Sequence, residues 1–195
     1  NGVKRFIYSS SSSVYGDPTE VPTGENHSIN PMSPYALQKH VGEQYCSLFS
    51  KIYGLETVSL RYFNVFGNRQ RDEGAYALAT GIFLRQHRNG ESLTVTGDGE
   101  QKRAFVCVDD IVRANIKAAN SDKVGNGEVI NIGSGNPISI NEIASSISDN
   151  IKYIEERLEP KVTCADITLA KELLDWSPTM SFRDWLKKEE ILWVI

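Results

Sequence analysis

The chain has 195 residues, enough for one sizeable hydrophobic core or a core with a small lobe, and its hydrophobic (40%) and charged (24%) fractions are those of an ordinary globular protein. Its net charge of −4 and pI near 5.5 exclude a broadly basic surface, so we expect it to bind neither nucleic acid nor anionic membranes. Three widely spaced cysteines, with no CxxC or Cys/His cluster, argue against a disulfide framework and against a metal site. No signal peptide or membrane-length apolar run is visible, and we expect a cytoplasmic protein.

Apolar periodicity divides the chain into alternating strands and helices. In chain order we predict a strand at 5–10, a helix at 34–52, a strand at 56–63, a helix at 75–88, strands at 92–96 and 104–108, a helix at 110–120, a strand at 127–132, and helices at 140–150, 167–175 and 182–194. This alternation indicates an α/β fold with a parallel sheet. Asp109 and Asp110 precede apolar helical residues, and we interpret them as an N-terminal cap that also stabilises the helix dipole, rather than as a catalytic pair.

The first predicted strand has no partner strand before it. No glycine-rich turn of the GxGxxG type, which would hold the phosphates of a dinucleotide, occurs in the sequence. We therefore expect the dinucleotide-binding half of such a fold to be missing from this chain.

A helix-start motif precedes a tyrosine and a lysine. Ser33 is expected as the N-cap and Pro34 as the first helical residue. Tyr35 and Lys39 then lie four residues apart on one helical face. Because an ammonium beside a phenol favours the phenolate, Tyr35 is a candidate general base. The alternative is a chance Tyr-x-x-x-Lys pattern among eight tyrosines, with a half-buried tyrosine and an exposed lysine.

Five consecutive serines, Ser9 to Ser13, precede Tyr35 by about twenty residues. Such a run is compatible with a flexible linker. Here a strand precedes it and Val14-Tyr15-Gly16 follows it, which favours a strand end that opens into an active-site loop.

Together with the segment Leu60 to Gly67 (LRYFNVFG), these motifs resemble those of the NAD-dependent nucleotide-sugar epimerase/dehydratase family, a group of extended short-chain dehydrogenases/reductases. The similarity is greatest to UDP-glucose and UDP-N-acetylglucosamine 4-epimerases, and it covers nearly all of the chain. It implies the C-terminal part of a doubly wound, Rossmann-like parallel sheet, formed by residues 1–70, and a small α/β substrate-binding lobe. Residues 71–195 would form most of that lobe, with about 100–120 returning to the main domain.

The resemblance implies NAD as the cofactor and a UDP-hexose as the substrate, whose C4 is inverted by transient oxidation. Tyr35 would be the catalytic base, Ser11 would relay the proton, and Lys39 would bind the nicotinamide ribose. Tyr35, Lys39 and Phe63 would contact the cofactor. The implied substrate-binding residues are Ser11, Asn64, Thr94, Thr96, Arg103, Arg157, Glu159 and Thr163. Thr163, a small residue, would leave room for an N-acetyl group.

Related reactions place different demands on the site. Dehydratases and decarboxylases need a further acid/base pair, and Ser12 and Ser13 stand where dehydratases carry two acids, so we reject dehydration. A nucleotide-sugar 4-reductase stays open, as does a partial fragment that only binds a UDP-sugar or self-associates.

The family pairs its subunits through the Tyr35 helix, and the resemblance implies a homodimer. The apolar stripe on that helix could serve this pairing or pack on its own sheet; it consists of Leu37, Val41, Tyr45 and Leu48.

Overall fold

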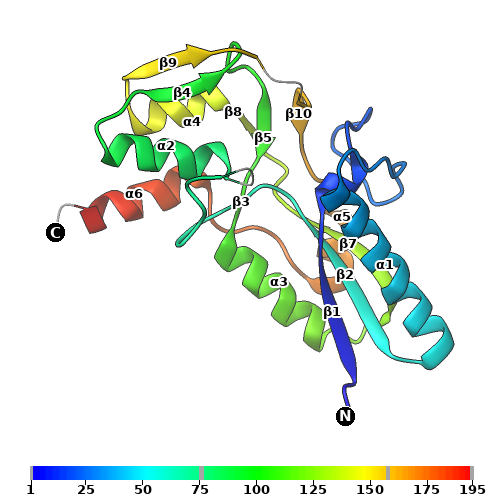
Figure 1. Cartoon of the computed structure of the whole chain (residues 1–195). Coiled ribbons are helices and arrows are strands. Elements are labelled where there is room, and N and C mark those ends of the chain that lie inside the picture. Colours follow the sequence, from blue (N-terminus) through cyan, green and yellow to red (C-terminus); the bar gives the residue numbers. More distant parts are fainter. Residues whose placement is uncertain (1, 75–76, 157–158, 194–195) are drawn as a thin grey trace.

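Three parallel strands form the main sheet of the computed structural model, which describes residues 2–74, 77–156 and 159–193 (Figure 1). Their order is β1 (Arg5–Ser11), β2 (Glu56–Tyr62) and β7 (Asn126–Ile132). In register, Ser11 lies beside Tyr62 and Tyr62 beside Ile132, so the carboxyl ends of the three strands are level. This confirms the predicted α/β class with a parallel sheet, and ligands of such sheets bind beyond this carboxyl edge.

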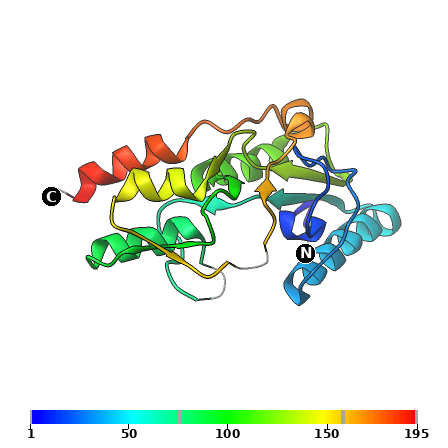
Figure 2. The same ribbon diagram turned by 90° about the horizontal axis from the view of Figure 1, so that it is seen from above.

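Helices cover both faces of the main sheet (Figure 2). Helix α1 (Pro34–Tyr53) lies on one face, and α3 (Val108–Asn120) and α5 (Thr168–Leu174) lie on the other. As predicted, the Ser33 side chain caps α1 by accepting a hydrogen bond from the Ala36 N–H at 3.1 Å. The helix ends at Gly54, whose left-handed backbone (φ 65°) suits glycine.

The face of the sheet that meets α3 and α5 is apolar. Alternate residues of β2 and β7 pack there against small side chains of the two helices; they are Val58, Leu60, Ile130 and Ile132, all fully buried. Each such aliphatic side chain contributes roughly 1.5–3 kcal/mol on burial. Because β7 and α5 belong to this layer, more of the chain after residue 70 returns to the main sheet than the expected segment at about 100–120.

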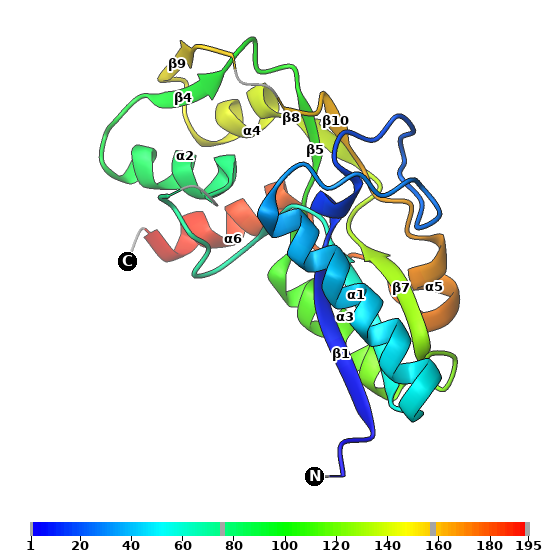
Figure 3. The same cartoon turned by 45° about the vertical axis from the view of Figure 1, so that its right-hand side comes forward.

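A small lobe with its own core lies beside the main sheet (Figure 3). It contains α2 (Ala79–Arg88), α4 (Ile140–Ile147), α6 (Phe182–Trp193) and the parallel pair β4 (Leu93–Thr96) and β9 (Ile151–Ile154). Its core consists mainly of aromatic and aliphatic side chains, among them Phe66, Phe83, Leu93, Val95, Ile143, Phe182 and Trp185. No described helix combines the length and the apolar character needed to cross a membrane.

Short strands connect the sheet to the lobe. β5 (Lys102–Ala104) pairs in parallel with β10 (Val162–Thr163) and antiparallel with β8 (Pro137–Ser139). β3 (Val65–Phe66) pairs with β6 (Val106–Cys107), and a 3₁₀ turn, η1 (Ser12–Tyr15), follows β1.

The structure corrects several predicted boundaries. The strand predicted at 104–108 is two strands, β5 and β6, separated by Phe105. The helix predicted at 140–150 ends at Ile147, since β9 begins soon after. Asp109 and Asp110 do not cap α3, because the helix begins earlier, with Cys107 as its N-cap. Both carboxylates lie in its first turn, where the predicted dipole stabilisation acts. η1, β3, β8, β9 and β10 were not predicted.

Candidate active site and sugar-nucleotide site

The first turns of α1 lie against the carboxyl end of β1. The Lys39 ammonium donates a hydrogen bond to the Ser9 carbonyl at 2.6 Å, and it lies 5.6 Å from the centre of the Tyr35 ring. It also lies 5.5 Å from the centre of the Tyr8 ring. Since Ser9 precedes Ser11 by two residues in β1, the lysine brings the start of α1 to the strand end that carries the candidate serine.

Ser11 lies at the junction between β1 and η1. Its extended backbone ends the strand, and its hydroxyl accepts a hydrogen bond from the Ser13 N–H at 3.2 Å, which caps the 3₁₀ turn. The serine run is therefore a strand end followed by an ordered turn, as predicted, and not a linker. Ser11, Tyr35 and Lys39 all belong to the carboxyl edge of the main sheet.

A second group of predicted residues gathers around β5 and β10. Thr163 lies beside Arg103 in the strand register, and its hydroxyl accepts a hydrogen bond from the Asn64 side-chain amide at 2.9 Å. The Arg103 guanidinium, itself buried, donates to the Glu159 carboxylate at 2.8 Å. These four residues come from three distant parts of the sequence, and the fold brings them together.

The two threonines of β4 lie in different settings. Thr96 is linked to the group around Arg103, because the Gln101 side-chain amide donates to the Thr96 carbonyl at 3.1 Å and to Glu159 at 3.3 Å. The Thr94 hydroxyl instead accepts a hydrogen bond from the buried Gln86 of α2 at 2.9 Å.

The remaining predicted residues are Phe63 and Arg157. The Phe63 side chain is buried in a cluster with Val14, Tyr15 and Ala165, just past the end of β2. Its proposed contact with the cofactor stays a prediction. Arg157 lies outside the described residues.

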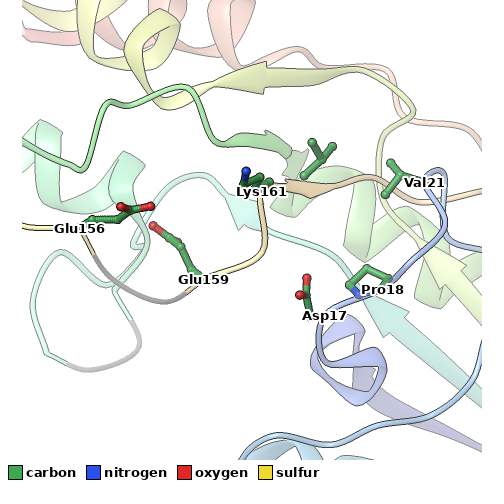
Figure 4. A pocket seen from close by; sticks show the side chains of 7 residues that line it. Asp17, Pro18, Val21, Glu156, Glu159 and Lys161 are labelled. Atoms are coloured by element: carbon green, nitrogen blue, oxygen red, sulfur yellow. The ribbon is translucent and has the colours of Figure 1, made fainter.

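A cavity of about 740 Å³ lies between the loop after η1 and the segment that leads into β10 (Figure 4). Asp17, Pro18 and Val21 line one side of it, and Glu156, Glu159 and Lys161 line the other. Val162 also belongs to the lining. Its volume is within the range of small-molecule sites. Its lining holds three carboxylates and one ammonium, so a negatively charged ligand would depend on the neighbouring Arg103.

The sequence analysis missed a buried polar network beneath this site. The Arg61 guanidinium in β2 donates two hydrogen bonds to the Glu43 carboxylate in α1, at 2.8 and 2.7 Å, and a third to the Tyr15 hydroxyl at 2.8 Å. Tyr15 in turn donates to Asn131 of β7 at 2.7 Å. Polar residues that alternate within the otherwise apolar strand β2 were the signal that could have revealed it.

Comparison with known proteins identifies the group to which this arrangement belongs. Residues 1–133 match the model of the "NAD dependent epimerase/dehydratase family". A "Putative UDP-glucose 4-epimerase" of Methanocaldococcus jannaschii is 38% identical over 193 residues, which are 95% of this chain and 62% of the relative. The chain thus spans about three fifths of the length of that relative.

Solved structures agree with this match. A UDP-N-acetylglucosamine 4-epimerase from Methanobrevibacter ruminantium, in complex with UDP-N-acetylmuramic acid, superposes with a TM-score of 0.88 at 38% identity, covering 97% of this chain and 64% of that one. A UDP-glucuronic acid 4-epimerase from Bacillus cereus, in complex with UDP-glucuronic acid and NAD, has a TM-score of 0.85 at 36% identity, with 98% and 62% covered. Other relatives are a UDP-sugar decarboxylase and a GDP-mannose 3,5-epimerase, at 35% and 32% identity. By its motifs, its fold and these matches, the chain belongs to the NAD-dependent epimerase/dehydratase family.

Proposed function

We propose that this chain carries the catalytic and sugar-nucleotide-binding part of an NAD-dependent UDP-hexose 4-epimerase. The observation that carries the proposal is the Lys39 ammonium, held on the Ser9 carbonyl beside the Tyr35 ring at the carboxyl edge of the sheet. The phenol of Tyr35 is a group that can remove and return a proton, and the lysine lies beside its ring.

In the proposed reaction the Tyr35 phenolate takes the proton from the sugar 4-hydroxyl as C4 is oxidised to a ketone. The Ser11 hydroxyl hydrogen-bonds the same oxygen and relays its proton. NAD, if bound at this edge, would supply the hydride acceptor for this oxidation and the hydride donor for its reversal. Tyr35 then gives the proton back to the C4 oxygen as the ketone is reduced to the inverted alcohol, so neither protons nor electrons are consumed.

The residues present fit the nicotinamide-ribose end of this cofactor. An ammonium has three N–H donors, and Ser9 accepts one of them, so Lys39 has donors for ribose hydroxyls. Lys39 is only partly buried and lies at the edge where parallel sheets bind dinucleotides. We propose that Tyr35, Lys39 and Phe63 contact the cofactor.

The nucleotide half of the substrate is proposed to lie along the group around β5 and β10. Arg103 would pair with the diphosphate, because a guanidinium matches phosphate oxygens in charge and geometry. Asn64 and Thr163 would lie nearer the sugar, with Glu159 and Thr96 toward the ribose and base. Thr94 and Arg157 complete the proposed set of substrate ligands.

The outward face of α1 supports the proposed homodimer. Leu37, Val41, Tyr45 and Leu48 are 53%, 42%, 61% and 49% exposed, so this stripe does not pack on the chain's own sheet. A continuous apolar face on a helix of 20 residues is typical of an interaction surface. We propose that two copies of the chain bury it against each other.

The test is proton NMR of UDP-glucose, UDP-N-acetylglucosamine and UDP-glucuronate, each incubated with the protein and NAD. The galacto epimer of at least one of them should appear, and Tyr35→Phe should abolish it. Ser12 and Ser13, which carry no carboxylate, lead us to expect neither loss of CO₂ nor loss of water from these sugars. Decarboxylated or dehydrated product without an epimer would contradict the proposal.

A further inference from the structure

The face that α1 presents to the main sheet contains a buried carboxylate, although the outward face of the helix is apolar. Its buried residues are Ala36, Glu43 and Cys46. On the sheet side, the residues of β2 that point toward α1 include Thr57, which bonds the Cys46 carbonyl at 2.8 Å, and Arg61. Hydrogen bonds depend on direction and apolar packing does not, so these directional contacts help to determine where the helix lies.

The strongest of these contacts joins Glu43 to Arg61. Both side chains are at least 95% buried, and the guanidinium meets the carboxylate with two parallel hydrogen bonds. Ser10, which lies beside Arg61 in the strand register, donates a further hydrogen bond to the same carboxylate at 2.5 Å. Burial alone would raise the pKa of Glu43, but the hydrogen bonds and charge of Arg61 hold it below its ordinary value, so the pair is ionised.

Glu43 lies on the same side of α1 as the proposed catalytic residues. Lys39 precedes it by one helical turn and Tyr35 by two, so a rotation or shift of α1 about Glu43 would move both. Next to Glu43, a side chain on Gly42 would come within 2.2 Å of the Tyr8 ring, so the helix lies in close contact with β1 at this point.

Arg61 also holds the loop that forms one wall of the cavity. Besides the Tyr15 hydroxyl, its guanidinium bonds the Glu25 carbonyl at 3.3 Å. The Glu25 carboxylate accepts a hydrogen bond from the Asn131 N–H of β7 at 2.8 Å. The loop that contains Asp17 and Val21 lies between these anchors, so one guanidinium connects that wall with α1.

We propose that Arg61 and Glu43 are positioning residues, which hold Tyr35 and Lys39 in place relative to Ser11 and to the cavity wall. This role rests on the proposed function of that site. It differs from a simple contribution to stability, because a buried ion pair replaced by apolar side chains of similar size often leaves a protein equally stable. The positioning role, in contrast, is lost when apolar side chains replace the ion pair, even if the protein stays equally stable.

The experiment therefore compares two double variants of the whole chain. Glu43→Leu with Arg61→Met removes the pair, and Glu56→Leu with Arg5→Met removes the Arg5–Glu56 pair (2.7 Å) at the opposite end of the same strands. Each protein is labelled with ¹³C at lysine Cε and tyrosine Cζ, and the signals of Lys39 and Tyr35 are assigned by Lys39→Arg and Tyr35→Phe. Melting curves show that each variant is folded.

We expect the chemical shifts of Lys39 Cε and Tyr35 Cζ to change in the Glu43/Arg61 variant. In the Arg5/Glu56 variant both shifts should equal those of the unchanged protein, whatever the two melting temperatures are. Unmoved signals in a folded Glu43/Arg61 variant would overturn the proposal. If that variant does not fold, Glu43→Asp, which keeps the carboxylate but shortens it, takes its place with the same criterion.

Turnover separates this proposal from the proposed function. With an active sugar nucleotide, kcat should fall about 10- to 100-fold in the Glu43/Arg61 variant, as a small misplacement of catalytic groups does, while KM changes little. Wild-type kcat in that variant would also overturn the positioning role. If the unchanged chain turns over no UDP-sugar but the NMR signals move as expected, the positioning role stands and the proposed function fails.

Discussion

The carboxylate of Glu159 pairs at 2.8 Å with the Arg103 guanidinium, the group that we propose binds the substrate diphosphate. An anionic ligand must compete with this internal carboxylate for the same donors. Glu159→Gln removes the competing charge but keeps a side-chain carbonyl that can accept a hydrogen bond from the ribose. It should therefore strengthen UDP binding, by about tenfold if the charge-assisted contact that it removes contributes about 1.5 kcal/mol.

Isothermal titration calorimetry with UDP measures this effect. Glu156→Gln is the matched control, because it removes the same charge from the same cavity without a bond to Arg103, and its effect should be smaller. Weaker binding in the Glu159→Gln variant would mean that the ribose contact needs the full carboxylate charge, which would contradict the competition for Arg103.

Lys39 should matter for catalysis far more than for stability. Lys39→Met removes the ammonium beside Tyr35 and one hydrogen bond to the Ser9 carbonyl. We expect turnover to fall at least about 100-fold, as for loss of acid/base assistance. The free energy of unfolding should fall by only about 0.5–1.5 kcal/mol.

The epimerase assay and a urea titration check these two quantities. Lys51→Met, an exposed lysine in the last turn of the same helix, serves as the control and should change neither quantity appreciably. A Lys39→Met protein with normal turnover would remove the lysine from the proposed mechanism.

Asp110 should make the protein sensitive to acid. Burial alone would raise the pKa of this carboxyl, but hydrogen bonds from Arg113, Thr179 and Met180 outweigh burial and hold the pKa below its ordinary value. A group with a lowered folded-state pKa contributes stability above its unfolded pKa, about 3.9 for aspartate, and loses that contribution as the pH falls through the folded pKa.

Asp110→Asn should therefore lower stability near neutral pH, by about 1–3 kcal/mol, and flatten its decline below pH ~4. Thermal melts from pH 3 to 7 measure both. Asp109→Asn, the exposed neighbour in the same helical turn, should leave the acid limb of the curve unchanged. Parallel curves for Asp110→Asn and the unchanged protein would contradict this explanation.

Self-association should depend on the outward face of α1. Tyr45→Glu places a charge in the middle of the exposed stripe and should convert a dimer to a monomer in analytical ultracentrifugation, with little change in melting temperature. Ile116→Glu, an equally exposed apolar position on α3, is the control. A dimer lost only in the Ile116→Glu variant would place the interface on the other side of the sheet.

The sequence predicted the elements that have strong local signals. The Ser33-Pro34 start of α1 and the apolar runs of β1, β2 and β7 placed the main sheet and its carboxyl edge within one or two residues. The short strands β8, β9 and β10 have two to four residues each and exist because distant partners pair with them, so no local pattern marks them.

The same contrast holds for the site. The spacing of Tyr35 and Lys39 along one helix predicts that both belong to the site, and the end of one strand predicts the same for Ser11. The contacts of Asn64 with Thr163, and of Arg103 with Glu159, link residues 99 and 56 positions apart, which only the folded chain reveals. Arg61 belongs to the segment Leu60 to Gly67, and its local sequence does not identify Glu43 of α1 as its partner, since the two residues meet only in the folded chain.

The polar face beneath α1 also bears on how the chain folds. Arg5 pairs in register with Glu56, and Thr57 with Asn126, so each parallel pairing closes a long loop and forms slowly. During synthesis, β1 and β2 emerge well before β7. In that interval α1, which precedes β2 in the chain, can already cover the sheet face around Ser10 and Arg61. The apolar face with Val58 and Leu60 has to wait for α3 and α5, so we expect this second face to be the aggregation-prone one of the half-built sheet.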